Sequence, residues 1–128
     1  MIFTASEKSY ADAILDFIDP KQRYFDTRLY RDSCIETAIS CGGSSYLKDL
    51  RIIGNRRLED LIIVDNAVLC FALQLTNGVP ILPFFTDKQD DELLHLLYYL
   101  ESIAECDDVR VRNREAFSLE DMLNNHED

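Results

Sequence analysis

Basic residues are scarce in this chain, and their scarcity excludes one class of function. The 128 residues hold 13 Lys and Arg against 24 Asp and Glu, which gives a formal net charge of -11. Proteins that bind nucleic acid need clustered Lys and Arg to contact phosphates, so we expect no direct nucleic-acid partner. Any site for an anionic ligand must therefore be a local basic pocket within a repelling surface.

Metal-binding cysteine patterns and membrane segments are also absent from the sequence. The four cysteines form no Cys-x-x-Cys pair and no zinc-like cluster with histidine, so we expect free thiols in a reducing compartment. No apolar run approaches the roughly 20 residues that cross a bilayer, and the first residues do not resemble a signal peptide. We expect a soluble protein of the nucleus or the cytoplasm, with no membrane partner.

The chain alternates between strand and helix patterns and is long enough for one domain. The opening "MIFT" is typical of a strand, and Ser6 is placed to cap a helix. Apolar residues then recur at helical spacing from Tyr10 to Phe17, and Asp19-Pro20 ends the helix. This order of elements predicts an α/β fold.

The middle of the chain predicts an insert, followed by a further strand, helix and tail. Residues 24–50 are short mixed segments around Gly42-Gly43, which predicts an irregular insert with a hairpin. "VPILPFF" predicts a strand, and Thr86 is placed to cap a helix in "DDELLHLLYYLESIAEC". The acidic residues 111–128 predict a frayed tail.

An apolar run that stops on Asp65 is the first candidate for a site. Leu61 to Val64 are four aliphatic residues in succession, which suits a strand buried on both faces of a parallel sheet. Ligand crevices form at the carboxyl ends of such strands, so Asp65 is a candidate metal or phosphate-site group. The alternative is a loop Asp that starts a turn.

Six segments occur in an order that resembles a known family. They are "IFTASEKSYADAILDFID", "RLYRDSC", "YLKDL", "IIVDN", "NGVPI" and "DDELLHLLYYLE", and they cover roughly residues 2–101. The chain resembles the catalytic domain of the phosphatases that act on the C-terminal domain of RNA polymerase II. This small C-terminal-domain phosphatase and Dullard group is also called NLI-interacting-factor-like, and it belongs to the haloacid dehalogenase superfamily.

The resemblance implies a fold and a reaction. The fold would be a haloacid dehalogenase-like parallel sheet flanked by helices, with a small hairpin insert, over residues 1–110. The reaction would be Mg²⁺-dependent hydrolysis of phosphoserine or phosphothreonine in a phosphoprotein, through an aspartyl-phosphate. Such a site needs a cation, a basic side chain and fixed hydrogen-bond donors around the phosphoryl oxygens.

The resemblance also assigns catalytic roles. Thr4 matches a hydroxyl donor to the phosphate, and the alternative is a strand-end Thr that caps the helix. Lys48 matches the basic residue that neutralises the phosphate and the nucleophile, although a lone Lys is more often a solvated surface charge. Asp65 and Asn66 match the motif that completes the magnesium site. Asn66 would be a direct oxygen ligand, and Asp65 would orient bound water or Lys48.

Two more residues match positions that contact the substrate. Arg31 matches an Arg near the substrate phosphate, where a planar guanidinium can hold two oxygens. Tyr10 matches a Tyr that lines the same region, and the alternative is an aromatic residue that faces the core. His95 is expected to be packed or solvated, with no catalytic role.

The sequence departs from the family in two places. The family's Asp-x-Asp-x-Thr, which carries the nucleophile and the general acid, does not occur in the 128 residues and should lie upstream of Met1. Its strand would pair between those bearing Thr4 and Asp65, so we expect an N-terminally incomplete sheet and a marginally stable monomer. A partner protein or a second copy could cover that sheet. Ala67-Val68 stands where the family has Ser-Pro, which weakens capping by about 1 kcal/mol.

Three hypotheses remain open at this point. The chain is a phosphatase-family domain whose first motif lies outside the residues given, or a pseudophosphatase that binds a partner or a phosphopeptide without turnover. A third hypothesis is a relative of the mitochondrial import receptor built on the same domain. The missing nucleophile predicts that the chain as given is inactive.

Overall fold

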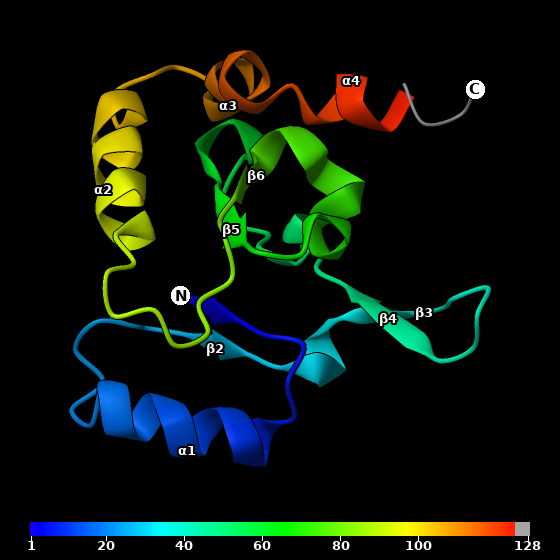
Figure 1. Ribbon diagram of the computed structural model, residues 1–128, viewed down its shortest axis with the longest axis vertical. Coiled ribbons are helices and arrows are strands. Elements are labelled where there is room, and N and C mark those ends of the chain that lie inside the picture. Colours follow the sequence, from blue (N-terminus) through cyan, green and yellow to red (C-terminus); the bar gives the residue numbers. More distant parts are fainter. Residues whose placement is uncertain (125–128) are drawn as a thin grey trace. The chain divides into compact units, whose positions relative to one another are not determined.

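The computed structural model describes residues 1–124 as a mixture of helices and short strands (Figure 1). The chain divides into two compact units, Met1–Asp49 (unit 1) and Leu50–Asp128 (unit 2). The strands pair as three two-stranded ladders, two parallel and one antiparallel. Helices combined with small parallel ladders fit the predicted α/β class. Among the described residues, no helix is long and apolar enough to cross a membrane.

Unit 1 begins with a strand, a helix and a second strand parallel to the first. Strand β1 (Ile2–Phe3) pairs with β2 (Arg28–Leu29), and helix α1 (Lys8–Ile18) connects them. The helix and its end before Pro20 confirm the sequence prediction. The apolar residues that predicted this helix are mostly not those that it buries. Ala11 and Leu15 are buried, while the side chains of Tyr10, Ile14 and Phe17 are exposed.

The predicted cap of this first helix is wrong. Glu7, and not Ser6, is the N-cap residue of α1, and its side chain makes no capping hydrogen bond. Ser6 is held in the preceding loop, because its N–H donates to Thr4 Oγ1 at 3.1 Å and its carbonyl accepts from Arg31 N at 3.0 Å. The first contact is local to the loop, whereas the second joins it to the segment after β2, which the sequence around Ser6 does not encode.

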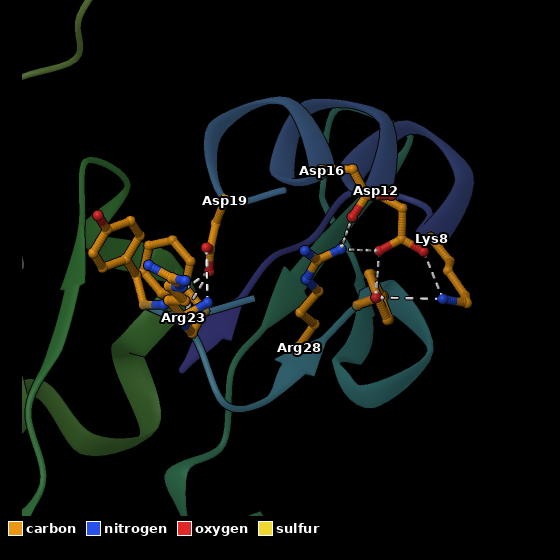
Figure 2. Close-up of polar contacts among 9 residues, drawn as sticks. Lys8, Asp12, Asp16, Asp19, Arg23 and Arg28 are labelled. Atoms are coloured by element: carbon orange, nitrogen blue, oxygen red, sulfur yellow. Dashed lines mark hydrogen bonds and ion pairs between the residues drawn. The ribbon is translucent and has the colours of Figure 1, made fainter. Parts of the chain in front are cut away.

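A buried carboxylate holds the loop after α1 (Figure 2). Asp19 is 1% exposed and accepts N–H bonds from Arg23, Tyr24 and Phe25 at 2.8, 2.9 and 3.2 Å. Burial opposes the ionisation of Asp19, but the three backbone donors outweigh it and hold the pKa of its carboxyl below the usual value. Asp19 therefore satisfies backbone donors at the turn that returns the chain to β2.

The rest of unit 1 is the predicted hairpin. The short 3₁₀ helix η1 (Arg31–Ser33) leads into β3 (Ile35–Ala38), which pairs antiparallel with β4 (Ser44–Leu47). Gly42 and Gly43 form its turn with φ of 88° and 99°, a left-handed region that favours glycine. The Gly-Gly signal thus located the hairpin correctly.

Unit 2 is built around one buried cluster. The 3₁₀ helices η2 (Leu50–Ile52), η3 (Leu58–Asp60) and η4 (Val68–Asn77) surround the parallel strands β5 (Ile63–Asp65) and β6 (Gly78–Pro80). Leu50, Ile63 and Phe71 form the buried cluster. The prediction of a strand buried on both faces is wrong, because Val64 is 37% exposed. Among the described residues β5 pairs only with β6, so neighbouring strands do not enclose it.

Three helices complete unit 2: α2 (Glu92–Ile103), α3 (Val109–Phe117) and α4 (Leu119–Asn124). Asp91, and not Thr86, is the N-cap residue of α2. The loop before it is organised by Asp side chains, since Asp87 Oδ1 accepts from Gln89 N and Asp90 Oδ1 accepts from Glu92 N. Such local bonds compete with the helical ones and delay the start of the helix.

Helix α3 crosses residue 110, where the sequence predicts that the tail begins. Asn113 is 2% exposed, and its amide donates to Thr76 O at 2.9 Å while its Oδ1 accepts from the Tyr99 hydroxyl at 2.6 Å. The rings of Tyr99 and Phe117 meet edge to face at 5.1 Å. Helices α3 and α4 cover residues 111–117 and 119–124 of the predicted tail, and residues 125–128 lie outside the described residues.

Candidate functional site

The carboxyl ends of β1 and β2 bring Thr4 and Arg31 to one edge of unit 1. Thr4 follows β1 directly, and its N–H donates to Leu29 O at 2.9 Å. Arg31 comes two residues after β2. Because the two strands are parallel, both carboxyl ends lie at the same edge, where ligands bind in open α/β sheets. The Thr4 hydroxyl accepts from Ser6 N, which leaves its own proton able to donate.

Arg31 is held in place on three sides. Its Nε donates to Ala5 O at 2.8 Å, and its Nη1 lies 3.1 Å from Glu7 Oε1. The guanidinium carbon lies 4.9 Å from the centre of the Tyr46 ring, a cation–π distance. The Ala5 and Tyr46 contacts pre-organise the guanidinium to meet an anion, because less freedom is lost on binding.

A cavity of about 310 Å³ opens beside Arg31. Its lining consists of Glu7, Lys8, Tyr30, Arg31 and Asp32. Two cations and two carboxylates thus share a small volume with one aromatic side chain. Sequence reasoning singled out only Arg31 among these residues. Glu7 and Lys8 lie within the first matched segment, but no pattern separates them from surface charges.

A charge network connects this cavity to helix α1 (Figure 2). Asp12 accepts from Lys8 Nζ, the Tyr30 hydroxyl and Arg28 Nη1 at 2.6, 2.6 and 2.9 Å. The Lys8 bond, followed by those of Tyr30 and Arg28, holds the pKa of Asp12 far below its usual range. Arg28 also donates to Asp16 at 2.8 Å, and these two carboxylates raise its pKa. The network fixes Tyr30 at the wall of the cavity.

Tyr10 and Lys48 lie in unit 1 with contrasting exposure. Tyr10, on α1, is 65% exposed, so the alternative of a core-facing aromatic does not describe it. Lys48, directly after β4, is 7% exposed and is therefore not the solvated surface charge that a lone Lys usually is. Lys48 follows Leu47, which pairs with Ile35, the residue after Cys34. The Cys34 thiol in turn contacts Thr4 O at 3.8 Å.

Asp65 and Asn66 belong to unit 2. Asp65 is the last residue of β5, and its Oδ1 accepts from Ala67 N at 2.8 Å. Asp65 therefore ends a strand, as predicted, and its side chain also begins a turn, which was the alternative prediction. Asn66 is exposed. Asn77 supports the segment before β5, since its Nδ2 donates to Leu58 O and Leu61 O at 2.6 and 2.8 Å.

One further cluster of possible metal ligands lies at the start of α2. Single ligand atoms of Asp91, Glu92 and His95 lie within 4.8 Å of one another. His95 is exposed and 3.6 Å from Asp91, as expected for a solvated histidine. The positive end of the helix dipole opposes a cation at this position.

Comparison with known proteins identifies relatives over most of the chain. A family model described as NLI interacting factor-like phosphatase matches residues 1–110. CTD small phosphatase-like protein 2 of Dictyostelium discoideum is 42% identical over 123 residues, which are 96% of this chain and 20% of that protein. CTD small phosphatase-like protein 3 of Caenorhabditis elegans is 43% identical over 124 residues, 96% of this chain and 41% of that protein.

A yeast relative carries a different name. Nuclear envelope morphology protein 1 of Saccharomyces cerevisiae is 33% identical over 120 residues, 86% of this chain and 26% of that protein. The chain spans less than half the length of each of these three relatives.

Proposed function

The chain belongs to the NLI interacting factor-like phosphatase family, and we propose that it acts on phosphoserine or phosphothreonine in phosphoproteins such as the RNA polymerase II C-terminal domain. The observation that carries the proposal is the family match over residues 1–110. The matched span includes all six candidate residues: Thr4, Tyr10, Arg31, Lys48, Asp65 and Asn66. We also propose that the protein is located in the nucleus or the cytoplasm. The name of the yeast relative, nuclear envelope morphology protein 1, supports a nuclear location.

The proposed fold is haloacid dehalogenase-like. Two parallel ladders support it, because each presents a candidate group at the carboxyl end of a strand. Thr4 follows β1, and Asp65 ends β5. In open α/β sheets, strand ends of this kind supply the groups of a ligand site.

The proposed roles in unit 1 are electrostatic. Arg31 would hold two phosphate oxygens, and Thr4 would donate its hydroxyl proton to another. Lys48 would neutralise the charge that develops on the phosphoryl group. The low exposure of Lys48 supports this role, because a cation with little access to water acts more strongly on a nearby anion.

Asp65 and Asn66 would hold Mg²⁺. Carboxylate and amide oxygens are the hard donors that Mg²⁺ accepts, and it is commonly bound by one or two protein ligands plus water and phosphate. The pair at the end of β5 fits this requirement in donor type. When bound, the ion would neutralise charge on the phosphate oxygens. The Asp65 bond to Ala67 N would meanwhile hold the orientation of the carboxylate.

The chain as given should not turn over substrate. Its 128 residues contain no Asp-x-Asp-x-Thr, so they supply no counterpart of the family's nucleophile. With p-nitrophenyl phosphate and Mg²⁺, we expect no release of nitrophenol above the uncatalysed background. A longer form that carries the motif upstream should be active. Turnover by the 128-residue chain that disappears in Lys48→Ala would show that another residue is the nucleophile.

Phosphopeptide binding is the second candidate function and is measurable without turnover. The Arg31 geometry favours it, because the guanidinium is held in place beside a cavity. We expect Mg²⁺-dependent retention of a phosphoserine peptide, weakened about tenfold or more in Arg31→Ala through loss of charge-assisted hydrogen bonds. The unphosphorylated peptide is the control. Equal retention of both peptides would contradict a phosphate site.

A further inference from the structure

The Glu7 carboxylate occupies one side of the Arg31 guanidinium. The two side chains form an ion pair at 3.1 Å, and their exposed fractions are 70% for Glu7 and 42% for Arg31. Both residues line the cavity of about 310 Å³. Two other contacts of Arg31 are of a different kind, since Ala5 O is a backbone group and Tyr46 covers a face of the guanidinium. The Glu7 contact therefore pairs the Arg31 guanidinium with a second charged side chain of the cavity lining.

Glu7 has no separate structural task that explains this position. It is the N-cap residue of α1, but its side chain makes no capping hydrogen bond. Its neighbour Lys8 is paired with Asp12 at 2.6 Å, so the cation beside Glu7 on the same helix is already engaged. The carboxylate of Glu7 is therefore directed to Arg31.

We propose that Glu7 is an internal competitor for the anion site of Arg31, so that a phosphate ligand must displace its carboxylate to bind. This inference rests on the proposed role of Arg31 in phosphate binding. An anion that reaches the cavity meets Nη1 of Arg31 already paired, and the apparent affinity is reduced by the fraction of molecules in which the pair is formed. Glu7 thus lowers the apparent affinity of the site for an anion, although it does not contact the bound ligand.

The size of the effect follows from the exposure of the pair. Solvent-exposed ion pairs are weak, so removing the Glu7 charge should raise the affinity for an anion about two- to fivefold. Competition for one donor also acts equally on every anion that needs it. The factor should therefore be the same for inorganic phosphate and for a phosphoserine peptide, and it should shrink as salt screens the pair.

Glu7→Gln in the full 128-residue chain tests the proposal. The dissociation constants of inorganic phosphate and of a phosphoserine peptide are measured by titration at low and high salt. Asp32→Asn is the matched control, because Asp32 lines the same cavity and the substitution removes the same charge. We expect tighter binding of both probes in Glu7→Gln, with little change in Asp32→Asn.

Four results would overturn the proposal, and Arg31→Ala distinguishes those that leave the proposed function intact from those that do not. An equal gain in both carboxylate variants would indicate general relief of charge repulsion in place of competition. An unchanged affinity in Glu7→Gln, with binding lost in Arg31→Ala, would retain Arg31 as the anion site and remove Glu7 as its competitor. Binding that survives Arg31→Ala, or no binding by either wild type or Glu7→Gln, would overturn the role of Arg31 and this inference with it.

Discussion

Gly78→Ala is expected to lower the free energy of unfolding by about 3 kcal/mol, through overpacking in the core of unit 2. Gly78 opens β6, and a Cβ placed there would overlap ring atoms of Phe71. Phe71 is fully buried in the core cluster, so its ring has little room to move. The backbone at Gly78 is ordinary, with φ of -85°, and it is the close approach of the ring that demands glycine.

Thermal unfolding followed by circular dichroism measures this effect, and a fall of about 10 °C is expected for a chain of this size. Gly54→Ala is the matched control, because nothing lies within 4 Å of a Cβ built at Gly54. Adding Phe71→Leu to Gly78→Ala should cost less than the sum of the two single changes, since the smaller side chain relieves the overlap. Equal unfolding temperatures for the two glycine variants would contradict the predicted clash.

Asn77→Ala is expected to destabilise unit 2 by about 2–3 kcal/mol, because it leaves two backbone carbonyls without their donor. The Asn77 side chain is 1% exposed, and its amide bonds the carbonyls of Leu58 and Leu61. Those carbonyls belong to the segment that enters β5 and ends at Asp65. The substitution should therefore also increase hydrogen exchange at the amides of β5.

Urea unfolding and hydrogen exchange measure the two parts of this prediction. Asn55→Ala is the control, since Asn55 is exposed in the loop before η3 and surface substitutions usually change stability by less than about 0.5 kcal/mol. Asn77→Asp should be at least as harmful as Asn77→Ala, because a carboxylate would face two carbonyl oxygens. If Asn77→Ala matched Asn55→Ala in stability, the two short hydrogen bonds would not support the segment.

Elements with strong local signals were predicted correctly from the sequence. The helix of residues 8–18, the hairpin at Gly42-Gly43 and the end of a strand at Asp65 all appear in the structure. Each depends on neighbouring residues alone, through helical spacing, turn glycines or an apolar run. The caps at Ser6 and Thr86 were wrong, because other local hydrogen bonds take their place.

The burial of individual side chains was predicted less well from the sequence than the elements were. Apolar spacing predicts a helix but does not say which of its residues another element will cover, and Tyr10, Ile14 and Phe17 are exposed in α1. Val64 is exposed for a related reason, since a run of aliphatic residues does not specify how many strands flank β5. Which strands pair, and which face of a helix another element covers, are decided by residues far away in the chain.

By itself, the sequence determined the family and the candidate residues, because the six ordered motifs are read along the chain without any knowledge of its folding. Only the tertiary structure decided how Arg31 is held and what competes for it. Ala5, Glu7 and Tyr46 are distant from Arg31 in sequence, and they reach it through the parallel pairing of β1 with β2 and the hairpin that follows. Contacts between segments so far apart depend on strand register, which no local pattern encodes.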